Sequence, residues 1–209
     1  MNLIKQLEWR YATKMFDPNK VVSDENIKKL QRVIQLSVSS YGLQLYKVLI
    51  IKDKKLREKL RPVSWNQQQI TDASHLFVFC SYTSVQNKYI DAYIDLTAKI
   101  RNLKKEDIEG YGDFMKTKIA EKNLQEQKGW LERQPYLALS NLLIACTELG
   151  IDACPMEGFE PEAYNEILNL NTKKLSACVI ATIGYRSEKD KSQHQKKIRK
   201  PVQELFELL

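Results

Sequence analysis

The chain has 209 residues, 43% of them hydrophobic, and this length and composition suit one globular domain with a substantial core. No run of about 18 apolar residues is present, so we expect no membrane partner, and the first residues lack the apolar centre of a signal peptide, so we expect a cytoplasmic protein. The formal net charge of +7 favours an anionic partner.

The distribution of charge and glycine narrows the choice of partner. The 33 basic residues are spread along the chain among 26 acids, without the dense stripe typical of a nucleic-acid-binding protein. Only seven glycines occur, and they form no G-x-G-x-x-G or Walker loop of the kind that cradles phosphates. Any bound phosphate must therefore be held largely by side-chain cations, which argues against a Rossmann nucleotide domain.

The cysteines predict no metal site. All four lie within or beside apolar stretches, and no Cys-x-x-Cys pair occurs. Because only two histidines are available, a Cys/His zinc cluster is not expected. We interpret the four cysteines as reduced thiols in the core: Cys80, Cys146, Cys154 and Cys178.

The first predicted element is a helix that Asn2 can cap. We expect its inward face to include Leu3, Ile4 and Leu7. Beyond it, Arg10 and Lys14 stand four residues apart near the helix exit, where two cations could meet an anion. Their spacing fits a solvated basic face equally well.

A second helix should begin after Ser23, because a serine followed by acidic residues is a typical helix start. Its apolar stripe consists of Ile27, Leu30, Val33 and Ile34. A loop rich in hydroxyl groups, residues 37–44, then precedes a predicted strand over 46–52. Serines in such a loop serve turn chemistry or contact a ligand, and the loop alone does not decide between the two.

The next segments alternate between a short helix over 54–60, an amide-rich stretch over 65–69 and an apolar run over 75–80. The uninterrupted apolar run predicts a strand buried on both faces. His75 begins it, and we interpret this histidine as structural because the sequence shows no serine or carboxylate arrangement to make it a catalyst.

The middle of the chain, residues 87–133, is charged and helical in character. One stripe is clear, and the later apolar residues are thinly spaced. We therefore predict a helical excursion that packs over a site or a partner instead of forming the core.

The stretch from Gln134 to Gly158 predicts a helix that opens with Pro135 in its first turn, is buried nearly all round, and ends in a left-handed cap at Gly150. A short extended piece, residues 151–154, then leads into a turn over 155–159. A turn bracketed by proline and glycine can present backbone N–H groups to a ligand, although an ordinary connection is equally consistent with this stretch.

The last strong strand is predicted over 176–185, and a basic segment over 189–200 precedes an apolar tail over 202–209. The apolar tail should be buried against something. Three strands separated by long helices predict an α/β or α+β architecture in which helices cover a mixed sheet.

Five short motifs occur in collinear order along nearly the whole chain. They are Arg10-x-x-Thr13-Lys14-x-Phe16, Ser37-x-Ser39-Ser40-x-x-x-Gln44, Asn66 upstream of Asp72-Ala73-Ser74-His75, Gly150 followed by Pro155-Met156-Glu157-Gly158-Phe159, and Lys197-x-Arg199. In this order, with strands between them, they resemble the nitroreductase family of flavoproteins, in particular the oxygen-insensitive NAD(P)H nitroreductase and dihydropteridine reductase type.

The resemblance implies an α+β, nitroreductase-like fold, with a mixed central sheet covered by helices, in an obligate intertwined homodimer with two FMN molecules at the interface. Residues 1–209 would form one domain. The helical excursion, about 87–133, and a basic and apolar C-terminal arm, about 186–209, would wrap the partner subunit.

The resemblance also implies which positions contact FMN. They are Arg10, Tyr11, Ala12, Lys14, Ser37, Val38, Ser39, Ser40, Gly42, Gln44, Asn66, Gln69, Pro155, Met156, Glu157, Gly158, Lys197 and Arg199. Tyr41 and Trp65 would shape the substrate pocket.

Individual roles follow from the same resemblance. Cations would hold the FMN phosphate, namely Arg10, Lys197 and Arg199. Ser39 and Ser40 would reach the flavin from the opposite subunit, and Asn66 would pair with its pyrimidine edge. The backbone of the 157–158 turn would donate to flavin N5. No general acid or base is assigned, and Lys14 and Glu157 would tune the flavin.

The implied reaction is a ping-pong exchange. NADPH or NADH would reduce the flavin by hydride transfer to N5, and a small electron-poor acceptor such as a nitroaromatic or a quinone would take up two electrons. Two alternatives stay open at this point: an enzyme of the same fold that dehalogenates a substrate or fragments flavin, and a basic nucleic-acid-binding module.

The sequence departs from the family's usual pattern at four places. Tyr11-Ala12 replaces His-Ser, Gly42 replaces an asparagine, Leu45-Tyr46 replaces Pro-Trp, and Gln69 replaces a second lysine near flavin N1. Loss of that lysine charge should make the flavin harder to reduce. These departures affect acceptor preference and rate more than flavin binding.

Overall fold

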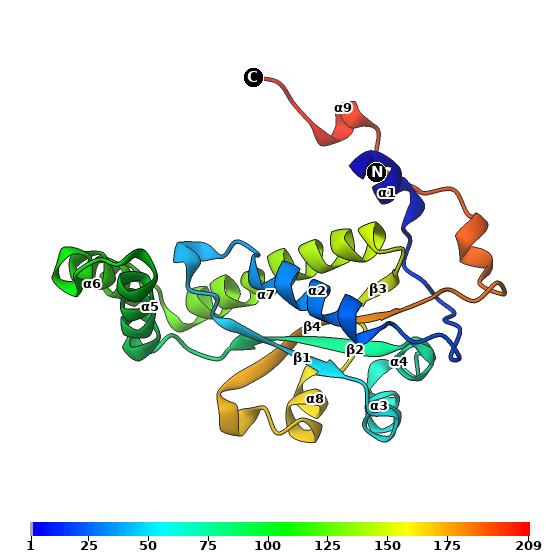
Figure 1. Cartoon of the computed structure of the whole chain (residues 1–209), viewed down its shortest axis with the longest axis horizontal. Helices are drawn as coiled ribbons and strands as arrows, with labels where there is room; N and C mark the ends of the chain where they lie inside the picture. Colours follow the sequence, from blue (N-terminus) through cyan, green and yellow to red (C-terminus); the bar gives the residue numbers. More distant parts are fainter. Residues whose placement is uncertain (1) are drawn as a thin grey trace.

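The computed structural model describes residues 2–209 and is built around a four-stranded sheet (Figure 1). The strands are β1 (Tyr46–Ile51), β2 (His75–Tyr82), β3 (Asp152–Met156) and β4 (Leu175–Gly184), in the spatial order β1-β2-β4-β3. The helices are α1 (Leu3–Trp9), α2 (Asp24–Gln35), α3 (Lys54–Leu60), α4 (Gln69–Asp72), α5 (Asn87–Arg101), α6 (Glu109–Ala120), α7 (Leu124–Glu148), α8 (Pro161–Ile167) and α9 (Val202–Leu205).

Helices cover both faces of the sheet, and the alternation of side chains along β2 shows how (Figure 1). Leu76, Val78 and Cys80 pack toward α3, α4 and α8 in one core. Phe77 and Phe79 point to the other face and join a second core with α2 and α7. All five side chains are fully buried, which confirms the prediction of a strand buried on both faces.

The sheet departs from the expected mixed pattern in two ways. All three strand pairs are antiparallel, and the parallel component is an isolated bridge between Ala12 and Ala153. The extended piece after Gly150 is itself a strand, β3, so the sheet has four strands where the sequence indicated three. With five residues and a proline at position 155, β3 is too short to carry a clear period-two signal.

Helix α7 begins ten residues before the predicted start. Asn123 and Glu126 form a capping box, in which each side chain accepts a hydrogen bond from the other residue's backbone N–H, at 2.9 Å and 2.8 Å. Pro135 therefore lies inside the helix instead of in its first turn. At the other end Gly150 has φ +64°, which confirms the left-handed cap. The caps predicted at Asn2 and Ser23 are also present.

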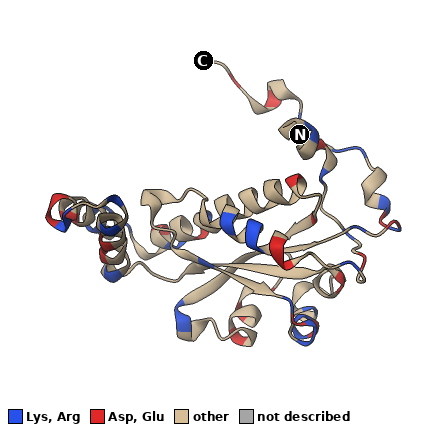
Figure 2. Cartoon of the chain, in the orientation of Figure 1, with Lys and Arg blue, Asp and Glu red and all other residues tan. Residues whose placement is uncertain are grey.

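Several apolar side chains that the sequence places inside lie on the surface of the single chain. In α1 the buried residue is Gln6, while Leu3, Ile4 and Leu7 are 50%, 65% and 41% exposed. Helix α7 is covered on one side by the sheet and α2. On its other side the side chains of Tyr136 and Leu137 are exposed. The tail with α9 is also exposed. Figure 2 shows that most of the α7 ribbon carries uncharged residues.

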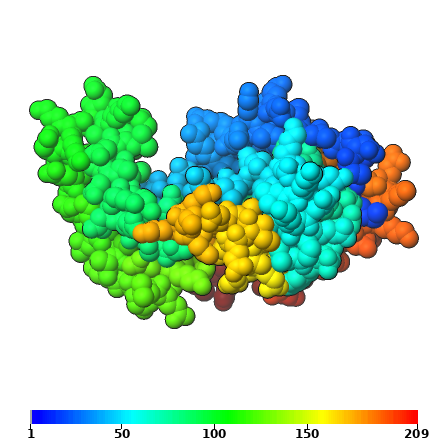
Figure 3. Space-filling model, turned by 90° about the horizontal axis from the view of Figure 1, so that it is seen from below, coloured from blue at the N-terminus to red at the C-terminus, as the bar shows by residue number. Residues whose placement is uncertain are grey.

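Helices α5 and α6 stand at one end of the molecule, apart from α1 and the C-terminal segment at the other end. Figure 3 shows them projecting from the body beside a hollow. They pack on each other through Ile90, Ile94, Met115 and Ile119. None of the helices within residues 2–209 is long and apolar enough to cross a bilayer.

His75 supplies a prediction about pH and stability. It is buried, its Nδ1 lies 2.8 Å from Ser74 Oγ, and Ser74 Oγ accepts a bond from the N–H of Val22, so the pair joins two segments. Burial, with smaller effects from Lys52 and Arg57, lowers the pKa of His75 from 6.5 to about 4. The unfolded chain therefore binds a proton that the folded chain rejects, so stability falls as pH drops between these values.

We expect His75→Asn to remove this pH dependence, because an amide oxygen can replace Nδ1 without titrating. The wild-type slope should reach at most roughly 1.4 kcal/mol per pH unit between pH 6.5 and 4. Urea unfolding at several pH values measures it. An unchanged slope in the variant would show that other groups carry the acid sensitivity.

Candidate functional site

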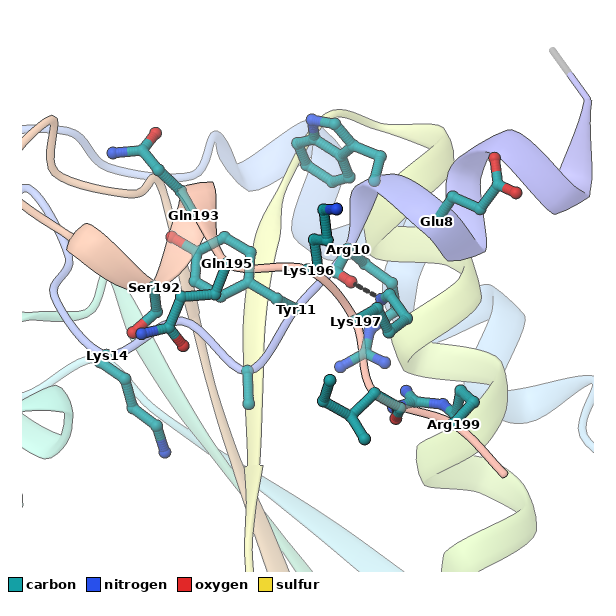
Figure 4. Close-up of a pocket in the computed structure, with 13 residues that line it drawn as sticks. Glu8, Arg10, Tyr11, Lys14, Ser192, Gln193, Gln195, Lys196, Lys197 and Arg199 are labelled. Atoms are coloured by element: carbon teal, nitrogen blue, oxygen red, sulfur yellow. Dashed lines mark hydrogen bonds between the residues drawn. The ribbon is translucent and has the colours of Figure 1, made fainter. Parts of the chain in front are cut away.

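A cavity of about 390 Å³ opens where the segment after α1 meets the C-terminal segment. Its cationic lining residues are Arg10, Lys14, Lys196, Lys197 and Arg199. Arg10 follows α1 directly, and the other end of the chain brings Lys197 and Arg199 to it (Figure 4). Residues about 190 positions apart in the sequence therefore form one basic pocket, as the phosphate-binding prediction requires.

The pocket concentrates positive charge without an acidic partner for each cation. Burial lowers the pKa of Arg10, and the nearby Arg199 lowers it further. Burial, followed by Arg10 and Arg199, also lowers the pKa of Lys197. Lys197 Nζ donates a hydrogen bond to the backbone oxygen of Arg10, which fixes their proximity. Cations held together in this way are stabilised by an anion that enters between them.

Two acidic residues that the sequence analysis missed support the lining of the pocket without being part of it. Asp190 accepts hydrogen bonds from the Tyr11 hydroxyl at 2.9 Å and from the N–H of Lys14 at 2.8 Å. Asp152, at the start of β3, accepts from Arg186 Nε at 2.7 Å. The signal available in the sequence is an aspartate inside a basic segment in the first case and a lone acid between apolar residues in the second.

Arg186 is the third residue behind the pocket lining that sequence reasoning missed. Its guanidinium lies 4.3 Å from the ring centroid of Trp9 and 4.6 Å from that of Tyr11. Such cation–π contacts fix the two rings at the pocket edge. The Tyr11 hydroxyl therefore points to Asp190 while its ring covers Arg186, which explains how the position that the family commonly fills with histidine is used here.

Strand β3 leads away from the cations. Ala12 pairs with Ala153 at its start. The pKa of the next residue, Cys154, is influenced by the charge of Lys14, by the side chain of Gln69 and by the charge of Arg10. Burial raises the pKa of the Cys154 thiol, and these three neighbours oppose the shift. Gln69, from α4, is buried and so lies beside the strand. Within residues 2–209, β3 pairs with β4 along one side; its other edge is bridged by Ala12 at Ala153, and no other strand pairs with it from Cys154 to Met156.

The far end of β3 meets the Trp65 turn. Gln67 Nε2 donates to the backbone oxygen of Gly158 at 2.8 Å, and Trp65 Nε1 donates to Glu160 Oε1 at 3.0 Å. Trp65 and Asn66 both have φ +53°, so the turn is held in a left-handed conformation. The predicted contacts from the 65–66 and 157–158 segments therefore lie together.

A second cavity, of about 470 Å³, adjoins the same end of β3 on the α7 side. Met156, Glu157 and Val179 line it together with Tyr136, whose hydroxyl donates to Glu157 Oε1 at 2.6 Å. The second cavity thus places an apolar surface next to the turn that the resemblance assigns to flavin N5. Within residues 2–209, no group of three or more His, Cys, Asp or Glu side chains could hold a metal ion.

Gly158 offers a direct test of the contact between the two turns. A Cβ at this position would lie 2.8 Å from Trp65 Cε3 and 3.2 Å from Gln67 Nε2. We expect Gly158→Ala to push the Trp65 turn away from the end of β3. If the chain has the NAD(P)H-dependent reductase activity that the resemblance implies, kcat/KM for that reaction should fall by about tenfold, because small displacements at a reacting centre are costly. Steady-state kinetics measure this, with Gly129→Ala, which meets no atom within 4 Å, as control. Equal rates in both variants would contradict it.

The serine loop lies elsewhere in the single chain. The Ser40 N–H donates to Gln134 Oε1 at 2.8 Å, and Ser37 Oγ accepts from Asn141 at 2.8 Å. Gln6 of α1, near the cation pocket, instead contacts Glu148 at the other end of α7. The 14 residues from 134 to 148 correspond to about 21 Å of helix. One chain therefore does not bring Ser39 and Ser40 to its own cation pocket.

Other positions in the serine loop are occupied by local structure. Tyr41, Gly42 and Gln44 all have positive φ, of 56°, 74° and 46°. Ser39 Oγ accepts from the Gln44 N–H at 3.0 Å, and Tyr41 packs against Trp130 with ring centroids 6.3 Å apart. Glycine at position 42 suits this backbone, because a Cβ there would lie 2.9 Å from the hydroxyl of Tyr93.

A family model and several named relatives match nearly the whole chain. The model described as "Nitroreductase family" matches residues 7–185. The chain is 31% identical over 213 residues to "Putative NAD(P)H nitroreductase SH0546" of Staphylococcus haemolyticus, covering 98% of this chain and 96% of that protein. It is 33% identical over 197 residues to "Putative NAD(P)H nitroreductase YfkO" of Bacillus subtilis, covering 88% of each.

Solved structures agree on the fold. The nitroreductase ydfN of Bacillus subtilis, described as putative, superposes with a TM-score of 0.87 at 21% identity over 99% of this chain and 98% of that one. A nitroreductase of Exiguobacterium sibiricum, also described as putative and solved in complex with FMN, superposes with a TM-score of 0.85 at 17% identity over 100% and 98%. At these identities the likeness establishes the shared α+β fold.

Proposed function

Because this chain belongs to the nitroreductase family, we propose that it is an FMN-dependent NAD(P)H oxidoreductase that reduces electron-poor acceptors such as nitroaromatics or quinones. Relatives named as NAD(P)H nitroreductases support the use of a nicotinamide reductant, and the fold neighbour in complex with FMN supports the cofactor. The polar groups along β3 can be compared with the two ends of the FMN molecule, its phosphate and its ring system.

The single observation that carries the proposal is the edge of β3 beyond Ala153, which pairs with no other strand and runs between a basic pocket and a polar turn. Arg10, Lys197 and Arg199 lie at one end, and the Trp65 turn with Gly158 lies at the other. Five strand residues span about 16 Å. This suits an extended molecule with a phosphate at one end and a ring system at the other, so the donor set fits FMN.

When bound, FMN would accept hydride from NAD(P)H and pass two electrons to an acceptor in a ping-pong sequence. The chain's own residues bind and orient it. Cations neutralise the phosphate, and Lys14 adds a positive charge near Cys154, toward the middle of β3. Asn66 would pair with the polar edge of the ring, and the backbone of the 157–158 turn would donate to N5. Trp65, 67% exposed, is available to shape the acceptor pocket.

We also propose that two copies of this chain, each a single domain over residues 1–209, complete the site as an intertwined homodimer. Ser39 and Ser40 lie far from their own cation pocket, so they would serve the pocket of the partner. The apolar side chains exposed on α1, α7 and the tail form the surface that a second copy would bury. The helical excursion and the C-terminal arm would then wrap the other subunit.

An anaerobic titration tests the proposed activity. The purified protein should carry yellow oxidised flavin that bleaches when NADPH or NADH is added and regains its colour when a nitroaromatic or a quinone follows. Steady-state rates with both nicotinamides identify the preferred reductant. A protein that stays colourless after incubation with excess FMN would refute the proposal, and a bound flavin that neither nicotinamide bleaches would refute the reductase activity.

A further inference from the structure

We propose that Asp190 is a positioning residue of the phosphate end of the site: it fixes the C-terminal arm against residues 11–15 and so sets where Arg199 and Lys197 meet Arg10. The inference rests on the proposed FMN function and adds a residue that the family motifs and the predicted cofactor contacts do not include.

The contacts of Asp190 join the two ends of the chain. Its Oδ2 accepts hydrogen bonds from the Tyr11 hydroxyl at 2.9 Å, the Lys14 N–H at 2.8 Å and the Met15 N–H at 3.1 Å. Its Oδ1 accepts from the Ser192 N–H at 3.0 Å. One carboxylate thus holds three groups of the N-terminal segment and the first turn of the arm.

Asp190 is buried and ionised. Only 1% of its surface is exposed. Burial raises its pKa, but the hydrogen bonds from Met15, Lys14, Tyr11 and Ser192 more than offset this and hold the pKa below its usual value. An ionised carboxylate can accept from all four donors, whereas an amide can do so with one of its two heavy atoms.

The base of the arm is held by the Ser187 N–H, which donates to the backbone oxygen of Met15 at 2.9 Å, and beyond Asp190 the arm has a further, weaker attachment to the N-terminal segment. Lys197 Nζ donates to the backbone oxygen of Arg10, and Lys197 itself is exposed. The cavity is lined by residues of the arm on both sides of His194, namely Ser192, Gln193 and residues 195–199 (Figure 4). Without Asp190, one exposed contact would hold the stretch between Ser187 and Arg199 to the N-terminal segment, so the distance of Lys197 and Arg199 from Arg10 would no longer be fixed.

Electrostatics and positioning predict opposite effects here. A negative charge beside a phosphate site repels the ligand, so removing that charge alone should strengthen FMN binding. If Asp190 instead holds the cations in place, its removal should weaken FMN binding. Riboflavin lacks the phosphate, so its affinity should be unaffected by a change confined to this end of the site. The sign of the effect and its dependence on the phosphate together identify a positioning role.

The experiment compares FMN and riboflavin binding to the full-length protein by flavin fluorescence, in wild type, Asp190→Asn and Tyr11→Phe. We expect Asp190→Asn to weaken FMN about tenfold, as expected for lost hydrogen bonds to a charged group, and to leave riboflavin within about twofold. Tyr11→Phe removes one of the four donors and should weaken FMN by about twofold to threefold.

Asp53→Asn is the matched control. Asp53 is also an aspartate that caps backbone N–H groups, through Leu56 N at 2.6 Å, but it starts α3 and lies outside the basic pocket. This variant should bind both flavins as wild type does. It therefore separates a site effect from a general loss of a cap.

Two results would overturn the inference: FMN affinity that is unchanged or higher in Asp190→Asn, or FMN and riboflavin affinities that fall together. If Asp190→Asn does not fold, Tyr11→Phe decides the question by the same ratio of FMN to riboflavin affinity. Wild type that binds neither flavin would instead refute the proposed function, so the two failures are distinguishable.

Discussion

Arg10→Ala is expected to weaken FMN binding by about 10-fold to 100-fold, the range for one charge-assisted hydrogen-bonded contact. Arg10 lies between the N-terminal segment and the arm, and both burial and Arg199 lower its pKa. The charged guanidinium is therefore disfavoured in the pocket, and a bound phosphate would stabilise it. Release of flavin from the diluted holoprotein, followed by fluorescence, measures the affinity.

Lys196→Ala is the matched control for Arg10→Ala. Lys196 lines the same cavity and carries the same charge, but Figure 4 shows its side chain directed away from Arg199. A surface lysine at that position should change the affinity by less than about threefold. Equal losses in the two variants would mean that net charge alone, not the geometry of the pocket, retains the cofactor.

Gln69→Lys is expected to raise the two-electron midpoint potential of the flavin. Gln69 is buried, and its side chain lies beside Cys154, midway along β3, where Lys14 also acts on the Cys154 thiol. A nearby positive charge stabilises the negative charge that reduction adds. The expected rise is on the order of tens of millivolts. A redox titration against dyes of known potential measures it.

The adjacent glutamine provides the control for this charge. Gln68 is exposed, and its amide donates to Asp72 Oδ1 at 2.8 Å, away from β3. Gln68→Lys adds the same charge to the same helix region without placing it beside the strand. The potential should change little in this variant. A potential that stays constant or falls in Gln69→Lys would refute the predicted role of position 69.

Local sequence signals predicted the elements that have strong local causes. The apolar run from His75 gave β2 and its burial on both faces, and Ser23 with its following acids gave the start of α2. The predicted start of α7 was wrong because the capping box at Asn123 lies eleven residues before Gln134, where the predicted helix stretch begins. Pro135 is tolerated within α7, so proline alone did not mark a boundary there.

Apolar side chains exposed on the single chain show what helical periodicity does not decide. Leu3, Ile4 and Leu7 show helical spacing, so the pattern predicted an inward face, yet they are exposed. Periodicity identifies a face that needs covering but does not say whether the same chain or another copy covers it. The apolar tail after Pro201 is a similar case.

The candidate site was predictable only as far as residue types reveal it. The cations at 10, 197 and 199 were identified through the resemblance to the family's motifs, and the structure brings them to one cavity. Asp190 and Arg186 were missed because their roles depend on contacts across more than 170 residues of sequence, which no local pattern encodes. The predicted flavin contacts of Ser39 and Ser40 stay predictions, since they involve a second chain.

The basic segment shows why charge composition alone was a weak guide. Residues 189–200 would serve a nucleic-acid-binding module if they formed an exposed stripe. In the structure, part of this segment lines the cavity beside Arg10, and Asp190 anchors it to the N-terminal segment. Positive charge that lines a small cavity suits a small anionic ligand better than a nucleic-acid strand, which favours the proposed flavin function over the nucleic-acid alternative.

Native mass spectrometry of the protein, purified and incubated with excess FMN, tests most directly whether paired chains hold the flavin. The predicted spectrum shows one dominant assembly of two chains with two FMN molecules. A single chain without FMN as the dominant species would contradict both the shared site and the cofactor.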